Sequence, residues 1–242
     1  MKKLFIYAIS CFLMVQNISA QDQTVQNGPL ISGTAPAFRA VSTMGDISFP
    51  GDYYGKWKIL FSHPADFTPV CTSEIMALAA MQDEFKKLRT ALIVISTDRL
   101  NSHIEWVNSI EAISIEGVAP VKIDFPLVSD SDLEISRLYG ILQSGHDQER
   151  DIRGVFIIDP DDQIRAFFYY PESVGRNTEE IKRTLIALQT QDKHDVFTPA
   201  NWQPGDDVLL KSPATKAEAE KLESKKDPRL RKVTWYMWYK EL

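Results

Sequence analysis

The sequence predicts an α/β protein in which helices flank a mixed central sheet. Short apolar runs with the length of buried strands alternate with segments whose apolar residues recur at helical spacing, and the series closes with a hairpin and a helix. The composition is that of an ordinary globular protein, with 44% hydrophobic and 25% charged residues among 242. The length suits one large domain, or one domain with an appendage.

The first half of the chain is expected to form a hairpin, two buried strands and two amphipathic helices. The hairpin turns at Gly45, and the strands are short apolar runs without alternation. In the helices, apolar residues recur every three or four positions opposite a polar face. The expected ranges are 38–49 for the hairpin, 56–62 and 91–96 for the strands, and 72–89 and 100–113 for the helices.

The second half continues with a short strand at 125–128 and a short helix at 132–139 that Gly140 ends. A hairpin follows, with strands at 151–158 and 164–170 around an Asp-Pro-Asp-Asp turn. The last helix of this unit is expected over 177–189. Asn177 or Thr178 is a suitable N-cap, and two glutamates lie in its first turn.

The chain changes character after Val196. Ser212 and Pro213 suit the N-cap and first position of a short charged helix over 214–224. From residue 211 onward there are nine Lys and Arg against five Asp and Glu, and the aromatic run Trp-Tyr-Met-Trp-Tyr lies at 235–239. A basic, aromatic arm on an acidic body indicates docking onto its own body or onto a sister subunit, the alternative being a frayed tail.

The first twenty residues have the layout of a secretory signal peptide. A basic start at Lys2 and Lys3 precedes an apolar run over 4–15, and small residues precede a polar stretch. We expect cleavage near Ala20–Gln21, export to the periplasm or medium, and no membrane span in the remaining chain. The alternatives are a buried N-terminal strand, a membrane anchor, or a lipoprotein cleaved before Cys11. The predicted division is a signal peptide (1–20), a main domain (21–198) and a C-terminal extension with the aromatic arm (199–242).

Charge and cysteine content exclude several classes of protein. A formal net charge of −6 argues against a nucleic-acid binder, which needs a basic face. Two cysteines exclude a disulfide-stapled scaffold and a cysteine-rich zinc site. The four histidines show no metal-ligand spacing, so neither a metal nor another cofactor is expected; they are His63, His103, His146 and His194. Removal of the signal peptide would leave Cys71 as a single free thiol.

Cys71 lies at the expected start of a helix, after a loop that follows a buried strand. The free N–H groups and the dipole of a helix N-terminus favour a thiolate over a thiol. Pro64 and Pro69 stiffen the loop, and Thr68 lies one helical turn before the cysteine. A thiolate, a hydroxyl and a nearby cation together suit a peroxide substrate. Without such context, an inert buried cysteine would be the preferred interpretation.

The segment Pro64-x-x-x-Thr68-x-x-Cys71 resembles the active-site signature of the peroxiredoxins, which are thiol peroxidases of thioredoxin-like fold with a C-terminal extension. The resemblance runs from about Gly33 to the C-terminus and is nearest to the 1-Cys, peroxiredoxin-6-type subfamily. The further motifs similar to that subfamily are Ser62-His63-Pro64-Ala65-Asp66-Phe67-Thr68, Tyr170-Pro171, Gly175-Arg176-Asn177 and Thr198-Pro199-Ala200-Asn201-Trp202.

The resemblance implies a role for each matching residue. Cys71 would be the peroxidatic cysteine, which becomes a sulfenic acid on reducing hydrogen peroxide or an organic hydroperoxide. Thr68 would orient the peroxide, Pro64 would shield the sulfur, and Arg153 would hold the thiolate and polarise the peroxide. The implied supporting residues are Glu74 and Arg176, which orient the arginine network, and His63 beside the pocket.

The departures from the family pattern are informative. Thr198 stands where two-cysteine members carry a resolving cysteine, so the reductant would be an external thiol or protein. No Gly-x-Ser-x-Gly pentapeptide occurs, so the lipase activity of some relatives is not expected here. The family also implies a homodimer or a larger ring.

Two other classes of function compete with a peroxidase. A holdase or binding module of thioredoxin-like fold would use the aromatic tail and need no catalytic Cys71. A dithiol oxidoreductase is disfavoured because the chain has no Cys-x-x-Cys.

Overall fold

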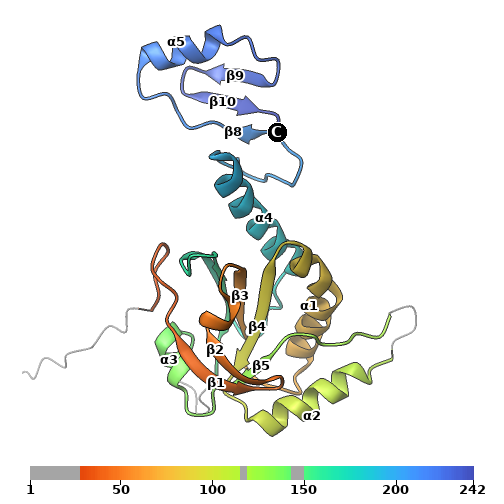
Figure 1. Cartoon of the computed structure of the whole chain (residues 1–242). Helices are drawn as coiled ribbons and strands as arrows, with labels where there is room; N and C mark the ends of the chain where they lie inside the picture. The colour runs from red at the N-terminus through yellow and green to blue at the C-terminus, as the bar shows by residue number, and fades with distance from the viewer. Residues whose placement is uncertain (1–27, 115–118, 143–149) are drawn as a thin grey trace, which may run out of the picture.

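The computed structural model of the protein describes residues 28–114, 119–142 and 150–242. The predicted signal peptide and His146 lie outside these ranges. Within them, a mixed seven-stranded sheet has the order β2-β1-β5-β4-β3-β6-β7, and Figure 1 labels its strands β1 to β5. Strands β3, β4 and β5 run parallel, while β6, β7, β1 and β2 are added in antiparallel fashion. The α/β, thioredoxin-like fold expected from the sequence is confirmed.

The elements of the main body follow one another in the predicted order. The strands are β1 (Phe38–Ser42), β2 (Gly45–Phe49), β3 (Trp57–Ser62), β4 (Thr90–Ser96), β5 (Leu127–Ser129), β6 (Arg153–Ile158) and β7 (Ile164–Tyr170). The helices are the short 3-10 helix η1 (Gly51–Tyr53) and the α-helices α1 (Pro69–Lys87), α2 (Leu100–Glu111), α3 (Glu134–Tyr139) and α4 (Thr178–His194).

Each face of the sheet has its own hydrophobic core, because successive strand residues point to opposite sides. Phe61 of β3 packs in one core with Leu78 of α1, Trp106 of α2 and Leu185 of α4. Its neighbour Leu60 packs on the other face, in the core that contains residues of α3 and of the N-terminal hairpin. The fully buried β3 is therefore covered on both sides, and the loop after it emerges from the centre of the sheet.

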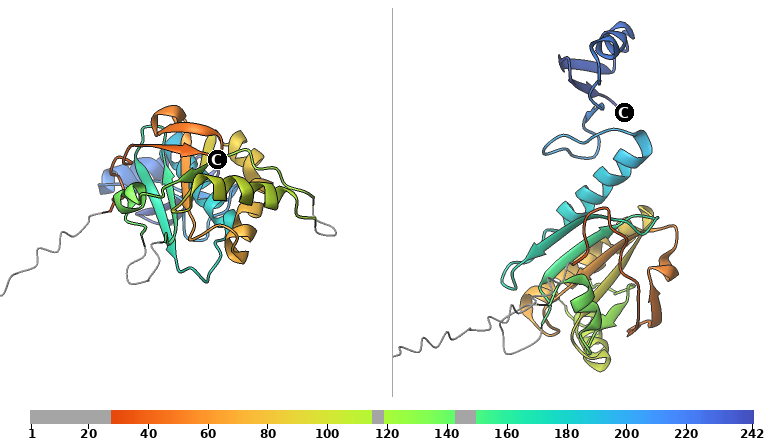
Figure 2. Two further views of the ribbon diagram at one scale, coloured as in Figure 1. Left: turned by 90° about the horizontal axis from the view of Figure 1, so that it is seen from below. Right: turned by 90° about the vertical axis from the view of Figure 1, so that its left-hand side faces the viewer.

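Helix α4 links this body to a small C-terminal unit, as Figures 1 and 2 show. Asn177 caps α4 by accepting hydrogen bonds from two backbone N–H groups of the first turn. The C-terminal unit contains α5 (Lys216–Ser224) and a three-stranded antiparallel sheet in the order β8-β10-β9. Its strands are β8 (Val208–Leu209), β9 (Leu230–Thr234) and β10 (Met237–Lys240).

Two expectations for the C-terminal region need correction. Helix α5 does not begin at Pro213 with Ser212 as its cap. Thr215 is the N-cap instead: its hydroxyl accepts from the Glu218 N–H, and the Glu218 carboxylate reaches back to accept from the N–H of Ala214, the residue before the cap. The frayed-tail alternative is wrong, because the aromatic run belongs to the β9–β10 hairpin, in which Trp238 is buried.

Other boundaries shift by a few residues. Helix α1 begins at Pro69 rather than at 72 because Thr68 has the extended backbone of an N-cap and Pro69 takes the first helical position. Helix α4 continues to His194, five residues past its expected end. In the described ranges, no helix is both long and apolar enough to cross a membrane.

Candidate active site

The loop between β3 and α1 delivers Cys71 to the first turn of a helix. Thr68 is the N-cap residue, and its carbonyl accepts the first helical hydrogen bond, from the Thr72 N–H at 2.9 Å. Cys71 is the third residue of α1 and is fully buried. Its sulfur therefore lies among the unpaired N–H groups of a helix N-terminus, where negative charge is stabilised. It is the one cysteine within the described part of the chain, and it is free.

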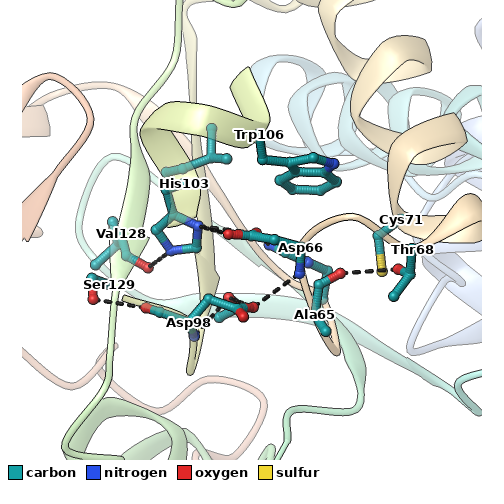
Figure 3. Close-up of polar contacts among 12 residues, drawn as sticks. Ala65, Asp66, Thr68, Cys71, Asp98, His103, Trp106, Val128 and Ser129 are labelled. Atoms are coloured by element: carbon teal, nitrogen blue, oxygen red, sulfur yellow. Dashed lines mark hydrogen bonds and ion pairs between the residues drawn. The ribbon is translucent and has the colours of Figure 1, made fainter. Parts of the chain in front are cut away.

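Pro64 and Thr68 shape the loop on the other side of the sulfur. Pro64 is buried, and it follows closely after the central strand. The Thr68 hydroxyl donates to the Ala65 carbonyl at 2.9 Å, which fixes the position of its oxygen beside Cys71 (Figure 3). A hydroxyl that donates a hydrogen bond to a carbonyl still has lone pairs free to accept another hydrogen bond.

Arg153 brings a cation to the sulfur from the first residue of β6. Its Nη1 donates to Cys71 Sγ at 3.2 Å and to Glu74 Oε2 at 2.7 Å. Its Nε and Nη2 donate to the Glu172 carbonyl at 2.8 and 2.6 Å, so the guanidinium is held from both sides. Arg153 is 1% exposed, and its charge acts on the sulfur with little screening by water.

Glu74 and Arg176 fix the position of Arg153. One oxygen of Glu74 accepts from the Arg176 backbone N–H and Nε, and the other accepts from Nη2 of Arg176 and Nη1 of Arg153. Nη1 of Arg176 also donates to the carbonyls of Ser62 and Gly154, both at 2.7 Å. Burial lowers the pKa of Arg176, while the Glu74 carboxylate opposes that shift. The carboxylate thus joins two guanidinium groups behind the sulfur.

His63 lies beside this site without a hydrogen bond to it. Its ring packs against that of Trp106 at a tilt of 33°, with centroids 4.9 Å apart, and burial lowers the pKa of His63 to about 3. The imidazole is consequently neutral near neutral pH. The structure therefore brings Cys71, Thr68, Pro64, Arg153, Glu74 and Arg176 together at the end of β3 and the start of α1, and it places His63 at their margin.

Two family models match the chain. The AhpC/TSA family matches residues 31–167, and the C-terminal domain of 1-Cys peroxiredoxin matches residues 187–226. A peroxiredoxin from Methanosarcina mazei is 46% identical over 214 residues, which cover 88% of this chain and 98% of that protein. This chain belongs to the peroxiredoxin family.

Solved peroxiredoxin structures share the fold over most of their length. The yeast mitochondrial 1-Cys peroxiredoxin is 37% identical with a TM-score of 0.76, and covers 88% of this chain and 99% of its own. A cysteine-to-serine mutant of the peroxiredoxin 6 of Arenicola marina is 31% identical with a TM-score of 0.78. The match covers 89% of this chain and 99% of that protein. The protein is a thiol-dependent peroxidase of the 1-Cys type, as the resemblance of its motifs implied.

Sequence reasoning missed several groups that support this peroxiredoxin site. The Glu172 carbonyl holds Arg153, and no side-chain pattern indicates such a backbone contact. Trp106 donates from its indole nitrogen to the Thr72 hydroxyl next to Cys71, and His103 pairs with Asp66 in the active-site loop. The apolar periodicity of this helix favoured a buried face through Ile104 and Val107, whereas the structure buries His103 and Trp106 and leaves Ile104 43% exposed.

Proposed function

We propose that Cys71 is the peroxidatic cysteine of this enzyme. Its thiolate attacks the terminal oxygen of a hydroperoxide, so that a sulfur–oxygen bond forms as the O–O bond breaks. The sulfur is oxidised to a sulfenic acid, and the departing oxygen takes up a proton and leaves as water or an alcohol. The observation that supports this most is the contact of a buried guanidinium, 3.2 Å from Sγ, with the one cysteine of the described residues.

The neighbouring residues have distinct parts in this proposal. Thr68 accepts a hydrogen bond from the peroxide, since its own proton is engaged with Ala65. Arg153 stabilises the thiolate and the charge that develops on the leaving oxygen. Pro64 excludes water from the sulfur without offering a backbone N–H. Glu74 and Arg176 act as positioning residues, because they contact Arg153 or each other rather than the sulfur.

The sulfenic acid is then reduced by a thiol from outside the chain. Cys71 has no second cysteine among the described residues with which to form a disulfide. The yeast mitochondrial relative resolves its thiol via glutathione/thioredoxin systems, which supports a small thiol or a dithiol protein as the reductant in this proposal. In the absence of reductant, continued exposure to peroxide should convert Cys71 to sulfinic acid.

One equivalent of hydrogen peroxide is expected to remove the Cys71 thiol far faster than it oxidises free cysteine, and to add one oxygen to the protein mass. Thiol titration and mass spectrometry of the reduced protein measure both. Cys71→Ser should abolish peroxide consumption, while Ser73→Ala, which alters an exposed hydroxyl two residues away, should keep it. The holdase alternative would be favoured instead if Cys71→Ser still consumed peroxide, or if the Cys71 thiol reacted with peroxide no faster than free cysteine does.

We further propose that residues 1–20 are a signal peptide and that the enzyme works outside the cytoplasm. The support is the basic, apolar and small-residue layout of this segment. Expressed with its own N-terminus in an export-competent host, the protein should appear in the periplasm or medium. Its measured mass should be that of a chain whose first residue is Gln21. Recovery of the uncut chain from the cytoplasm would contradict export.

We also propose that two copies of the chain pair through the C-terminal unit. Val233, Trp235 and Tyr236 are each more than half exposed, close together in the sequence of the β9–β10 hairpin, and exposed large apolar side chains favour a partner. The arm carries net positive charge and the rest of the chain net negative charge, which suits contact with a second copy. Light scattering should give at least a dimer, and deletion of residues 211–242 should lower the mass to that of a single shortened chain. A truncated protein that stays dimeric would count against pairing through this arm.

A further inference from the structure

Three buried side chains meet beside the peroxidatic site but outside its mechanism. His63 and Asp66 lie in the loop between β3 and α1, and His103 lies in α2. Both histidines are fully buried, and the Asp66 side chain is 1% exposed. Figure 3 shows the imidazole of His103 directed at the carboxylate of Asp66, well away from Cys71. Titratable groups with so little access to water require partners of suitable charge.

The hydrogen bonds of His103 fix which of its nitrogens carries a proton. Nε2 lies 3.1 Å from the Val128 carbonyl oxygen, which can only accept, so Nε2 is the N–H donor. In a neutral imidazole, Nδ1 then presents a lone pair. That lone pair faces both oxygens of Asp66, at 2.9 and 3.0 Å. Two acceptors at this separation need a shared cation, which is either a proton or a metal ion.

His63 directs a second imidazole at the same carboxylate. Its Nε2 lies 3.7 Å from Asp66 Oδ1, beyond hydrogen-bond distance. Neither of its ring nitrogens has a hydrogen-bond partner in the ranges that the structure describes. Its ring packs against that of Trp106 at a tilt of 33°, with centroids 4.9 Å apart. A buried imidazole whose ring nitrogens lack hydrogen-bond partners is a ready metal ligand.

We propose that His63 Nε2, the Asp66 carboxylate and His103 Nδ1 bind a divalent transition metal of the zinc type. Their ligand atoms all lie within 4.8 Å of one another. A tetrahedral zinc ion with bonds of about 2.0–2.1 Å requires ligands roughly 3.3–3.4 Å apart, so small side-chain shifts complete the site. Imidazole ligands select zinc-type ions over Mg²⁺ and Ca²⁺. The Val128 carbonyl supplies the outer contact that orients a metal-binding histidine.

This proposal departs from the expectation of no metal that we drew from histidine spacing. His63 and His103 are forty positions apart in the sequence, and only the packing of α2 against the active-site loop brings them together. Asp66 lies two residues before Thr68. A bound ion would therefore cross-link the loop that carries the peroxidatic site to α2, and would stabilise the fold by mass action.

The test is a zinc titration of the chelator-treated, reduced full chain by calorimetry, with Co²⁺ absorption as a second measurement. We expect one metal ion per chain and a higher thermal midpoint with zinc. Cys71→Ser should bind equally well, and the cobalt spectrum should lack a thiolate charge-transfer band. His63→Gln and Asp66→Asn should weaken binding at least tenfold, whereas His194→Gln, at the exposed end of α4, should not.

His63→Gln is the decisive variant, because the wild-type ring makes no hydrogen bond within the described ranges that the substitution could break. Its circular dichroism should match that of the wild type. Three results would overturn the proposal. They are a folded wild type that binds no metal, a folded His63→Gln protein with unchanged affinity, and loss of binding in Cys71→Ser, which would identify the thiolate as the ligand.

Discussion

Arg153→Gln is expected to slow the reaction of Cys71 with hydrogen peroxide by roughly 10²- to 10³-fold, the range found when one preorganised donor is removed from a developing negative charge. The wild-type guanidinium lies 3.2 Å from Sγ and is fixed by Glu74 and the Glu172 carbonyl. Glutamine keeps a polar side chain there but removes the positive charge. Stopped-flow mixing with peroxide gives the rate, and alkylation across a pH series reports the thiolate population.

Arg165→Gln is the matched control for this experiment. Arg165 belongs to β7, the strand next to β6, and pairs with Asp159 and Asp192 rather than with the sulfur. Arg165→Gln should leave the peroxide rate within about twofold of the wild type, because Arg165 does not contact the sulfur. The loss of a partly exposed ion pair should also change the stability of the fold only a little. Arg153→Lys tests the shape of the cation, because an ammonium cannot bridge Cys71, Glu74 and Glu172 together. Equal rates in Arg153→Gln and the wild type would exclude Arg153 from the reaction.

The order of the elements could be predicted because each is encoded locally. The apolar run of β3 and the helical periodicity of α1 are properties of short windows, and so is the Asn177 cap of α4. The small C-terminal sheet was not predicted. Strand β8 has only two residues, too few to show an apolar periodicity. Strand β10 pairs with β9 and also with β8, which is about thirty residues earlier in the sequence, so no short stretch of sequence contains all three strands. Dense aromatic residues in the tail indicated burial without giving its geometry.

The active site divides in the same way. Pro64, Thr68 and Cys71 share one short motif, and their placement follows from the start of one helix. Arg153 was assigned only through resemblance, since a lone arginine at a strand start carries no signal of its own. The contacts that hold it depend on tertiary packing: Glu74 is 79 positions away, and the Glu172 carbonyl is a backbone group. The Asp66–His103 pair was missed for the same reason.

Glu74→Gln is expected to lower the free energy of unfolding by about 3–5 kcal/mol, because it leaves two buried cations without their shared anion. The carboxylate accepts four hydrogen bonds of 2.7 to 2.9 Å from Arg153 and Arg176. Glutamine has nearly the same shape, so packing is retained. Its NH₂ group, however, points donors at guanidinium donors. Urea unfolding of the reduced protein measures the loss.

Glu84→Gln provides the comparison that separates burial from charge. Glu84 lies on the same helix as Glu74 and pairs with Lys182 at 2.7 Å, but its side chain is 52% exposed. Water replaces the lost contact, so the substitution should change stability far less than Glu74→Gln does. Glu74→Gln should also slow peroxide reduction, because Arg153 loses one of the groups that aim it at Sγ, whereas Glu84→Gln should not. Similar losses of stability in the two variants would mean that the buried carboxylate is not what holds the arginines in place.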